Sequence, residues 1–276
     1  MNLSFDLLAV RRWAEFSGDF NPIHFDLAHA QKAGLDKLIV HGMLAVMPIK
    51  QMLSRHGRLA MNASTEWMKF KAAFRYPLAH DANHEVSTKV GLNKINFQLV
   101  SGDAHRIEHF RGSYGPVAKM PAEVPVTPQA MTAQMHGFTL DQAQVARFAQ
   151  TYADISEYWV ALDAVVFSQF MRIGLPIVEH IVIDATATKR SRQLSESNTD
   201  FNTDKVVVQT SHCVTVDAAL DACDGVLHWA LMPPVLLVHA AQVSGSVSLP
   251  VYRDDRLVML VEIGLLAKVS PAPPLQ

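Results

Sequence analysis

Cysteine is nearly absent from this 276-residue chain, which has only Cys213 and Cys223. Two thiols are too few for a disulfide framework or a multi-thiolate metal site, and a reducing cytoplasm is the default expectation. The chain also has no run of 18 or more apolar residues, and Met1–Arg12 lacks a basic segment followed by an apolar one. We therefore expect neither a membrane span nor a secretory signal.

Charge is also scarce. Charged residues make up 18% of the chain, and the net charge of −2 suggests neither nucleic acid nor a membrane surface as a partner. The apolar share of 49% excludes disorder over most of the length. We find no P-loop, no GxGxxG, no nucleophile elbow and no HExxH, so no metal site is expected. Two histidine pairs with a spacing of four are interpreted as surface residues: His80 with His84, and His105 with His109.

Two halves with similar openings are visible in the chain. A proline-rich stretch at residues 115–128 is typical of a linker. A shift of 135 residues aligns the amphipathic opening at residues 5–24 with that at residues 138–159, and it pairs Asp19 with Asp154. We interpret this as a weak internal duplication. The predicted domains are residues 1–117 and 138–276, joined by a linker over residues 118–137.

Each half is predicted to be a long helix followed by antiparallel strands, which is an α+β pattern. Asp141 is expected to cap the helix that opens the second half, and Pro48 is expected to interrupt the long helix of the first half. The long helices are expected at residues 41–53 and 160–173. Strands are expected at residues 66–76, 84–90, 94–101, 106–114, 180–189, 205–216, 226–231, 235–247 and 257–269.

The chemically informative stretch lies between residues 16 and 44. Asp19 and His24 are separated by Asn21-Pro22, which favours a turn that folds the imidazole back beside the carboxylate. These two groups are the usual parts for moving protons near neutral pH. His41-Gly42 follows at a predicted helix start, where unpaired N–H groups and the helix dipole favour a developing negative charge.

Each of these residues also has a plain structural interpretation. Asp19 is able to cap a turn, His24 to be a core histidine, and Gly42 to serve only as a helix-start glycine. Their occurrence within one 24-residue span favours a functional site over three separate structural roles.

The sequence SGDFNPIH, followed by IVHGML, resembles the hydratase motif of the MaoC-like family, which includes (R)-specific 2-enoyl-CoA hydratases and related acyl-thioester dehydratases. The resemblance covers residues 5–115 and implies a hot-dog fold, in which an antiparallel sheet wraps a long helix. With the duplication, it implies a double hot-dog. It also implies that Asp19, His24 and Gly42 are catalytic. Ser17, Asn21, His41 and Met43 belong to the same motif and are assigned to substrate binding.

In the second half, the ungapped shift places Trp159 at the position of His24, so this half is expected to lack activity.

The resemblance predicts reversible hydration of a 2-enoyl thioester to a 3-hydroxyacyl thioester. The substrate would carry CoA or the phosphopantetheine of an acyl carrier protein, and no separate cofactor or metal is expected. Two alternatives stay open, an acyl-CoA thioesterase on the same fold and a non-catalytic acyl-thioester-binding subunit. A homodimer of such chains is also left open.

Overall fold

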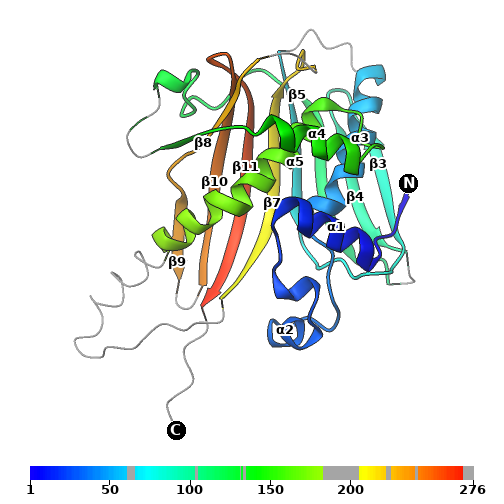
Figure 1. The fold of residues 1–276 in the computed structure, drawn as a ribbon. Helices are drawn as coiled ribbons and strands as arrows, with labels where there is room; N and C mark the ends of the chain where they lie inside the picture. Colours follow the sequence, from blue (N-terminus) through cyan, green and yellow to red (C-terminus); the bar gives the residue numbers. More distant parts are fainter. Residues whose placement is uncertain are drawn as a thin grey trace, which may run out of the picture.

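The computed structural model describes residues 1–60, 66–102, 105–130, 132, 135–182, 205–221, 225–239 and 242–269. In these residues, helices pack on an 11-stranded sheet whose paired strands are all antiparallel (Figure 1). The α+β class expected from the sequence is confirmed, and the architecture is consistent with the hot-dog fold. The strands are β1 (Asn2–Leu3), β2 (Trp67–Phe74), β3 (His84–Val90), β4 (Ile95–Ser101), β5 (Glu108–Val117), β6 (His136–Thr139), β7 (Lys205–Asp217), β8 (Leu227–Leu231), β9 (Val235–His239), β10 (Gln242–Arg253) and β11 (Arg256–Val269).

The order of strands in the sheet is β1-β3-β4-β5-β2-β7-β11-β10-β8-β6, with β9 paired to β10. Strands from the first part of the chain fill one side, and those from the second part fill the other. The two sides have the same order when β2 is matched with β7, β5 with β11, β4 with β10, β3 with β8 and β1 with β6. They meet where β2 and β7 pair, from Trp67 opposite Asp217 to Ala73 opposite Ser211.

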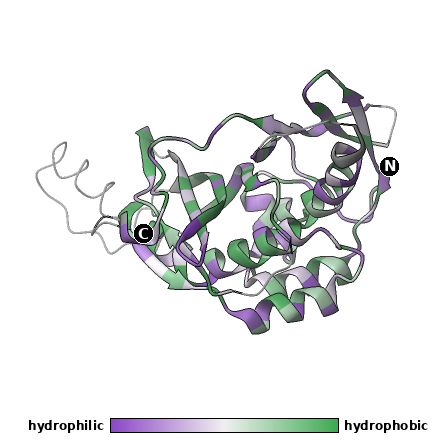
Figure 2. Ribbon diagram, turned by 90° about the horizontal axis from the view of Figure 1, so that it is seen from above, coloured by the Kyte–Doolittle hydropathy of each residue, from purple (hydrophilic) through white to green (hydrophobic). Residues whose placement is uncertain are grey.

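Two helices lie against one face of the sheet, α3 from the first part and α5 from the second (Figure 1). α3 contacts α5 as well as β2 and β5, and α5 also contacts α1 and α4. Hydrophobic and hydrophilic residues alternate along the strands and around the outer helices (Figure 2), as a two-layer core requires. The helices are α1 (Leu7–Ser17), α2 (Leu27–Lys32), α3 (Gly42–Ala60), α4 (Gln142–Thr151) and α5 (Tyr158–Gln169), with the short helices η1 (Pro22–His24), η2 (Pro128–Ala130) and η3 (Phe170–Gly174).

α5 is apolar on all sides because it is enclosed on all sides. Every residue from Trp159 to Gln169 except Ala161 is buried. The longer helical stretch Tyr158–Val182, of 25 residues, has the length and composition of a membrane span. However, 67% of its most apolar window is buried inside the protein. Length and composition are therefore weak evidence for a membrane span here, because a buried core helix has the same composition.

A charged cluster lies in the core between the two parts of the chain. Lys50 of α3, Asp163 of α5 and His212 of β7 are all fully buried. The Lys50 ammonium pairs with the Asp163 carboxylate, and the His212 Nε2–H donates to the same carboxylate at 2.9 Å. Gln209 donates to His212 Nδ1 at 3.0 Å, so a neutral imidazole satisfies both of its ring nitrogens.

The pKa values of this cluster reflect burial and the neighbouring charges. Burial lowers the pKa of Lys50, and Asp163 opposes that effect. For Asp163, burial acts to raise the pKa, but the nearby His212 and Lys50 together lower it overall. The cluster is therefore best described as one ion pair, Lys50 with Asp163, held by a neutral histidine.

Several sequence predictions for the elements need correction. α3 continues unbroken through Pro48 to Ala60, since tertiary packing holds the helix despite the missing N–H. The strand expected at residues 180–189 begins in a helix instead, because His180 and the two residues after it are helical, and residues 183–189 lie outside the described residues. The strand expected at residues 235–247 is two strands, β9 and the start of β10, which pair with each other. Asp141 caps α4 as expected, accepting from the Ala143 N–H.

The segment after β5 packs against the second part of the chain. Val124 is buried in a small cluster with Trp67 and Tyr252, and the Tyr252 hydroxyl donates to the Pro125 carbonyl at 2.9 Å.

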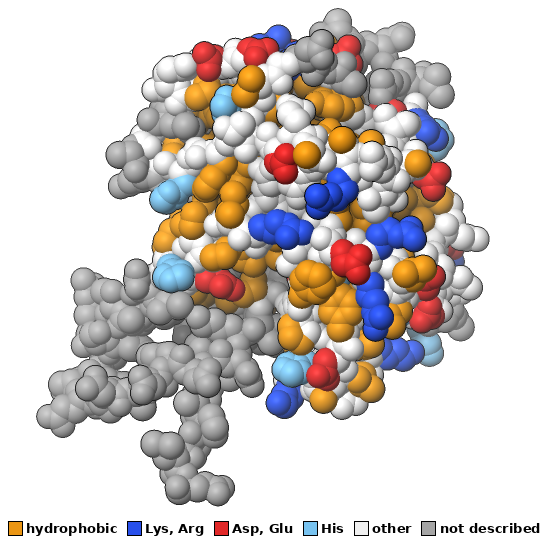
Figure 3. Space-filling view, in the orientation of Figure 1, with side chains coloured by type: hydrophobic (Ala, Val, Ile, Leu, Met, Phe, Trp, Pro, Cys, Tyr) orange, Lys and Arg blue, Asp and Glu red, His pale blue; other side chains and the backbone are white. Residues whose placement is uncertain are grey.

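Charged side chains of both signs are spread over the face of the protein seen in Figure 3, with hydrophobic side chains between them.

Candidate active site

The site begins at the end of α1, where the chain must turn sharply. Gly18 has φ +81°, the left-handed conformation that glycine adopts without strain, and its N–H closes the helix on the Ala14 carbonyl at 2.7 Å. A Cβ at Gly18 would also lie 2.9 Å from Cγ of Arg172. Both the backbone and the packing therefore require glycine immediately before Asp19.

Asp19 is held from both sides of its backbone. Its N–H donates to the hydroxyl of Ser17 at 3.1 Å, and its carbonyl accepts from Nε2–H of His41 at 2.9 Å. One carboxylate oxygen accepts the Asn21 N–H at 3.3 Å. The side chain of Asp19 remains 16% exposed while His41 is only 1% exposed. Ser17 and His41, motif residues assigned to substrate binding, thus contact the backbone of Asp19.

The Asn21-Pro22 turn brings His24 to the site, as predicted. The Asn21 side chain accepts the Ile23 N–H at 3.3 Å and starts the short helix η1, which has Pro22 in its first turn and ends at His24. The Asn21 amide also donates to the Val207 carbonyl of β7 at 3.1 Å. The turn is therefore tied directly to the second part of the chain.

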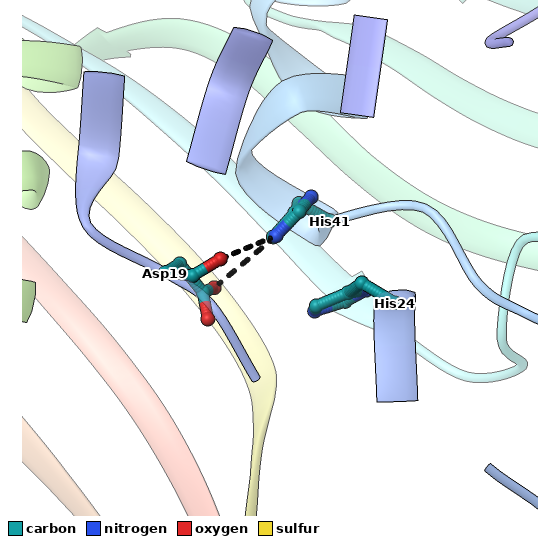
Figure 4. Close-up of side chains that lie close together, drawn as sticks. All are labelled: Asp19, His24 and His41. Atoms are coloured by element: carbon teal, nitrogen blue, oxygen red, sulfur yellow. Dashed lines mark hydrogen bonds and ion pairs between the residues drawn. The ribbon is translucent and has the colours of Figure 1, made fainter. Parts of the chain in front are cut away.

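The hydrogen bonds of the two histidines fix their tautomers. Nδ1 of His24 lies 2.8 Å from the Ile39 carbonyl, which only accepts, so Nδ1 carries the proton. The lone pair of a neutral His24 is then on Nε2. By the same reasoning His41 carries its proton on Nε2. The two rings stack with their centroids 3.6 Å apart (Figure 4).

Asp19, His24 and His41 each place a polar side-chain atom within 4.8 Å of the others (Figure 4). Burial raises the pKa of Asp19, against the opposing effects of His24 and the Asn21 N–H. Burial lowers the pKa of His24, against the opposing effects of Asp19 and the Ile39 carbonyl. The pKa of His41 is lowered well below its usual value by burial and by the neighbouring His24. Both histidines are thus favoured as neutral rings.

Gly42 begins α3 immediately after His41, as predicted. The first N–H groups of a helix have no partner within the helix and lie at the positive end of its dipole. Gly42 is half-buried, and a Cβ there would lie 2.6 Å from Cε2 of Phe74, so the packing admits only glycine. Met43 was predicted to bind substrate. It is 1% exposed and its sulfur accepts from Lys50, which are the surroundings of a core residue.

The segment that carries this site resembles a known protein family. Residues 8–108 match the family model described as MaoC like domain. The match covers 101 of the 276 residues and lies in the N-terminal part of the chain. The residues of the site, from Ser17 to Gly42, lie inside the matched range, and the family resemblance seen in the sequence is confirmed.

Similar proteins were found for a short segment of the sequence and for the overall fold. A mitochondrial 3-hydroxyacyl-[acyl-carrier-protein] dehydratase of Arabidopsis thaliana is 43% identical over 47 residues, which is 17% of this chain and 28% of that protein. The chain thus matches less than a third of the length of this curated relative. A solved MaoC domain protein dehydratase from Chloroflexus aurantiacus J-10-fl aligns over 99% of this chain and 94% of its own, with a TM-score of 0.50 and 10% identity. A second solved structure, described as a MaoC-like dehydratase, covers 95% and 94% with a TM-score of 0.47 and 10% identity. At such low identity the Chloroflexus structure bears on the fold alone.

The donor set of this site suits proton transfer better than metal binding. Asp19, His24 and His41 have the residue types and proximity of a metal site. However, Nε2 of His41 is bound to the Asp19 carbonyl and carries the proton, so its lone pair is not available there. Asp19 and His24 alone provide two ligands, whereas protein zinc sites use three or four.

The structure also corrects the interpretation of two histidines and adds residues that the sequence did not reveal. His84 and His109, expected at the surface, are buried at 2% and 6% exposure. Ser168 and Arg172 of the second part of the chain contact the end of α1 at the carbonyl of Phe16. No short-range pattern marks them, because their partners are more than 150 residues away.

Proposed function

We propose that the chain is a hydro-lyase that interconverts a 3-hydroxyacyl thioester and a 2-enoyl thioester plus water. The observation that carries this proposal is the proximity of the Asp19 carboxyl group to the His24 ring, whose Nε2 is unprotonated, next to the start of α3. A dehydratase needs one base, one acid and a donor for the thioester oxygen, and this site contains a candidate for each.

The direction of the pKa shifts supports a division of roles in dehydration. Burial lowers the pKa of His24 and raises that of Asp19, so both shifts act in the direction of a neutral imidazole next to a protonated carboxyl group. In this state His24 is the base and Asp19 the acid. Interacting groups of this kind titrate as a pair, and the reactive pair holds one proton.

In the dehydration direction, the proposed reaction begins at C2 of the 3-hydroxyacyl thioester. Nε2 of His24 takes the proton from C2, and the electron pair of the broken C–H bond moves toward the thioester carbonyl, whose oxygen gains negative charge. The N–H of Gly42 donates to that oxygen. The C2–C3 double bond then forms as the C3–O bond breaks, and the leaving hydroxyl takes the proton of Asp19 to become water. Hydration runs through the same steps in reverse. A donor such as the Gly42 N–H typically contributes about 3–4 kcal/mol to the transition state.

The matched strand orders support a further proposal, that the chain is a double hot-dog with halves 1–117 and 138–276 joined by residues 118–137. In the first half, the connection from α1 to α3 is residues 18–41 and carries the site. In the second half, the connection from α4 to α5 is residues 152–157. The second half would then lack the entire catalytic segment.

This difference corrects the ungapped match of Trp159 with His24. Trp159 lies inside α5, where its ring stacks 5.9 Å from Tyr114 and its N–H donates to Ser54. The second half therefore contributes packing at this position, where the first half has its site.

The thioester would be carried by CoA or by an acyl carrier protein. The similarity to the Arabidopsis 3-hydroxyacyl-[acyl-carrier-protein] dehydratase supports the carrier protein. The cytoplasm remains our expectation for the compartment. The reaction as written needs no redox cofactor, since the thioester already acidifies the C2 proton.

The test is to follow the ultraviolet absorbance of enoyl thioesters of several chain lengths, on CoA and on carrier protein. We expect Asp19→Asn and His24→Gln to lower kcat by about 100-fold or more, since a positioned acid or base contributes 10²–10⁴-fold. His29→Gln is the matched control, because His29 is an exposed histidine on α2, paired with Asp26.

Three outcomes would contradict the proposal. Near-normal turnover in either site variant would remove the pair from the mechanism. Release of free thiol from a saturated acyl-CoA would point to a thioesterase. Binding of enoyl thioester at one equivalent without turnover would point to a non-catalytic subunit.

A further inference from the structure

The end of α1 is held by side chains from the second part of the chain. An α-helix leaves its last carbonyl groups without partners inside the helix. Here the Glu15 and Phe16 carbonyls each accept from Arg172 at 2.9 Å, and the Phe16 carbonyl also accepts from the Ser168 hydroxyl at 3.0 Å. Phe16 lies three residues before Asp19, so these bonds anchor the chain directly ahead of the catalytic turn.

A buried chain of hydrogen bonds leads to the same carbonyl. The Trp229 N–H donates to Gln169, Gln169 donates to Gln144, and Gln144 donates to Ser168, at 2.5, 3.2 and 2.5 Å. Ser168 then donates to Phe16. All five residues are buried, with at most 8% exposure.

The donor and acceptor at each end of this series of hydrogen bonds fix its direction. The indole N–H of Trp229 only donates, and the Phe16 carbonyl only accepts. Each glutamine amide must therefore present its oxygen toward Trp229 and its nitrogen toward Phe16. The Ser168 hydroxyl has one remaining orientation, in which it donates to Phe16. Buried networks in which every member is satisfied are rigid, and this one connects β8, α4 and α5 to the end of α1.

Arg172 reaches its partners from an unusual element. It lies in η3, a five-residue π-helix that interrupts the long helix after α5. Such turns are rare and occur frequently at functional sites. The Arg172 side chain crosses Gly18 closely enough that no Cβ is accommodated there. Gly18 thereby allows the guanidinium to reach the two carbonyls next to the turn.

We propose that Ser168 and Arg172 are positioning residues for Asp19, and that the second half of the chain serves the reaction through them. This inference rests on the proposed function. The Asp19 carboxyl group must meet the leaving hydroxyl in a narrow range of geometry, and its backbone is already held by Ser17 and His41. Ser168 and Arg172 fix the helix end from which that backbone departs, so their loss moves the acid without removing it.

The experiment compares Ser168→Ala, Arg172→Met and Arg172→Lys with two matched controls. Arg147→Met removes an exposed arginine from α4, and Ser156→Ala removes a hydroxyl bonded to Gln51. We expect kcat to fall about 10- to 100-fold in Ser168→Ala and Arg172→Met, because small displacements of a reacting group cost this much. KM should stay within about twofold, since the thioester contacts are not removed. Lysine can donate to the same carbonyls, so Arg172→Lys should recover most of the loss.

A second measurement does not depend on turnover. Amide hydrogen exchange should become faster at residues 19–24 in Ser168→Ala and Arg172→Met but not in the two controls. If wild-type protein turns over no enoyl thioester, the proposed function fails, while the exchange data still decide whether these side chains hold the turn.

The inference is wrong if both kcat and the exchange at residues 19–24 are unchanged in Ser168→Ala and Arg172→Met. It is also wrong if kcat falls no further than in the controls, or if Arg172→Lys behaves like Arg172→Met. Should Arg172→Met not fold, Ser168→Ala carries the comparisons of kcat and of hydrogen exchange with the two controls.

Discussion

The buried pair of Lys50 and Asp163 gives a quantitative prediction for stability. Asp163→Asn keeps the shape of the side chain and removes its charge. The Lys50 ammonium is fully buried, and its other neighbours include the Met43 sulfur, the face of the Phe70 ring at 5.2 Å and the neutral His212. Cys213 also lies near it, and burial raises the pKa of that thiol to about 12, so the thiol is neutral. None of these supplies a full negative charge, so the variant must either keep an unpaired ammonium in the core or give up its proton.

The cost of each of these two outcomes limits the expected loss in the free energy of unfolding. Breaking a buried pair by removing one partner typically costs about 3–5 kcal/mol. Removing the proton from a lysine of ordinary pKa at pH 7 costs about 5 kcal/mol, which sets a ceiling. We therefore expect Asp163→Asn to lose about 4 kcal/mol at pH 7. For a chain of this size that corresponds to a fall in Tm of about 8 °C or more.

The loss should shrink as the pH rises. In the variant, Lys50 has a depressed pKa in the folded state and an ordinary one in the unfolded state, so the unfolded state binds more protons above neutral pH. Stability of the variant therefore rises with pH over this range. At pH 9 the ceiling falls to about 2 kcal/mol.

Urea unfolding at pH 7 and pH 9 measures both values, and Glu262→Gln is the matched control. Glu262 pairs with Lys69 at 3.2 Å, but these side chains are 33% and 23% exposed, so the control should lose under about 1 kcal/mol. A loss below 1 kcal/mol for Asp163→Asn at pH 7 would refute the reasoning. So would a loss that stays constant between the two pH values.

Three further predictions concern the site. The pH–rate profile should be bell-shaped, because the pair of Asp19 and His24 must hold one proton; the alkaline limb should disappear from the residual activity of Asp19→Asn. Gly42→Ala should lower both kcat and Tm, measured by steady-state kinetics and thermal melting, because the new methyl group would overlap the Phe74 ring. An unchanged kcat would show that the Gly42 N–H does not donate to the thioester oxygen. Asn21→Ala should lower kcat about tenfold or more in the same assay, by freeing the turn from β7, and an unaltered rate would show that this bond is dispensable.

The local features of the site could be predicted from the sequence, while its supports could not. The turn at Asn21-Pro22 and the helix start at Gly42 follow from short-range chemistry, and the structure has both. Arg172 has no such signal, because its role depends on a π-helix and on a helix end more than 150 residues away in the chain. The continuity of α3 through Pro48 was missed for the same reason, since tertiary packing outweighed a local preference.

The pairing of β2 with β7 also determines what holds the two parts of the chain together. Seven positions pair directly across this junction, and Lys50 and Asp163 close it from inside the core. A protease that cut the segment after β5 would therefore leave a nicked complex rather than two free fragments. Fragments expressed separately would each expose a long unpaired strand edge and would be prone to associate through it. The connecting segment sets which two parts meet, while the sheet and the buried pair keep them joined.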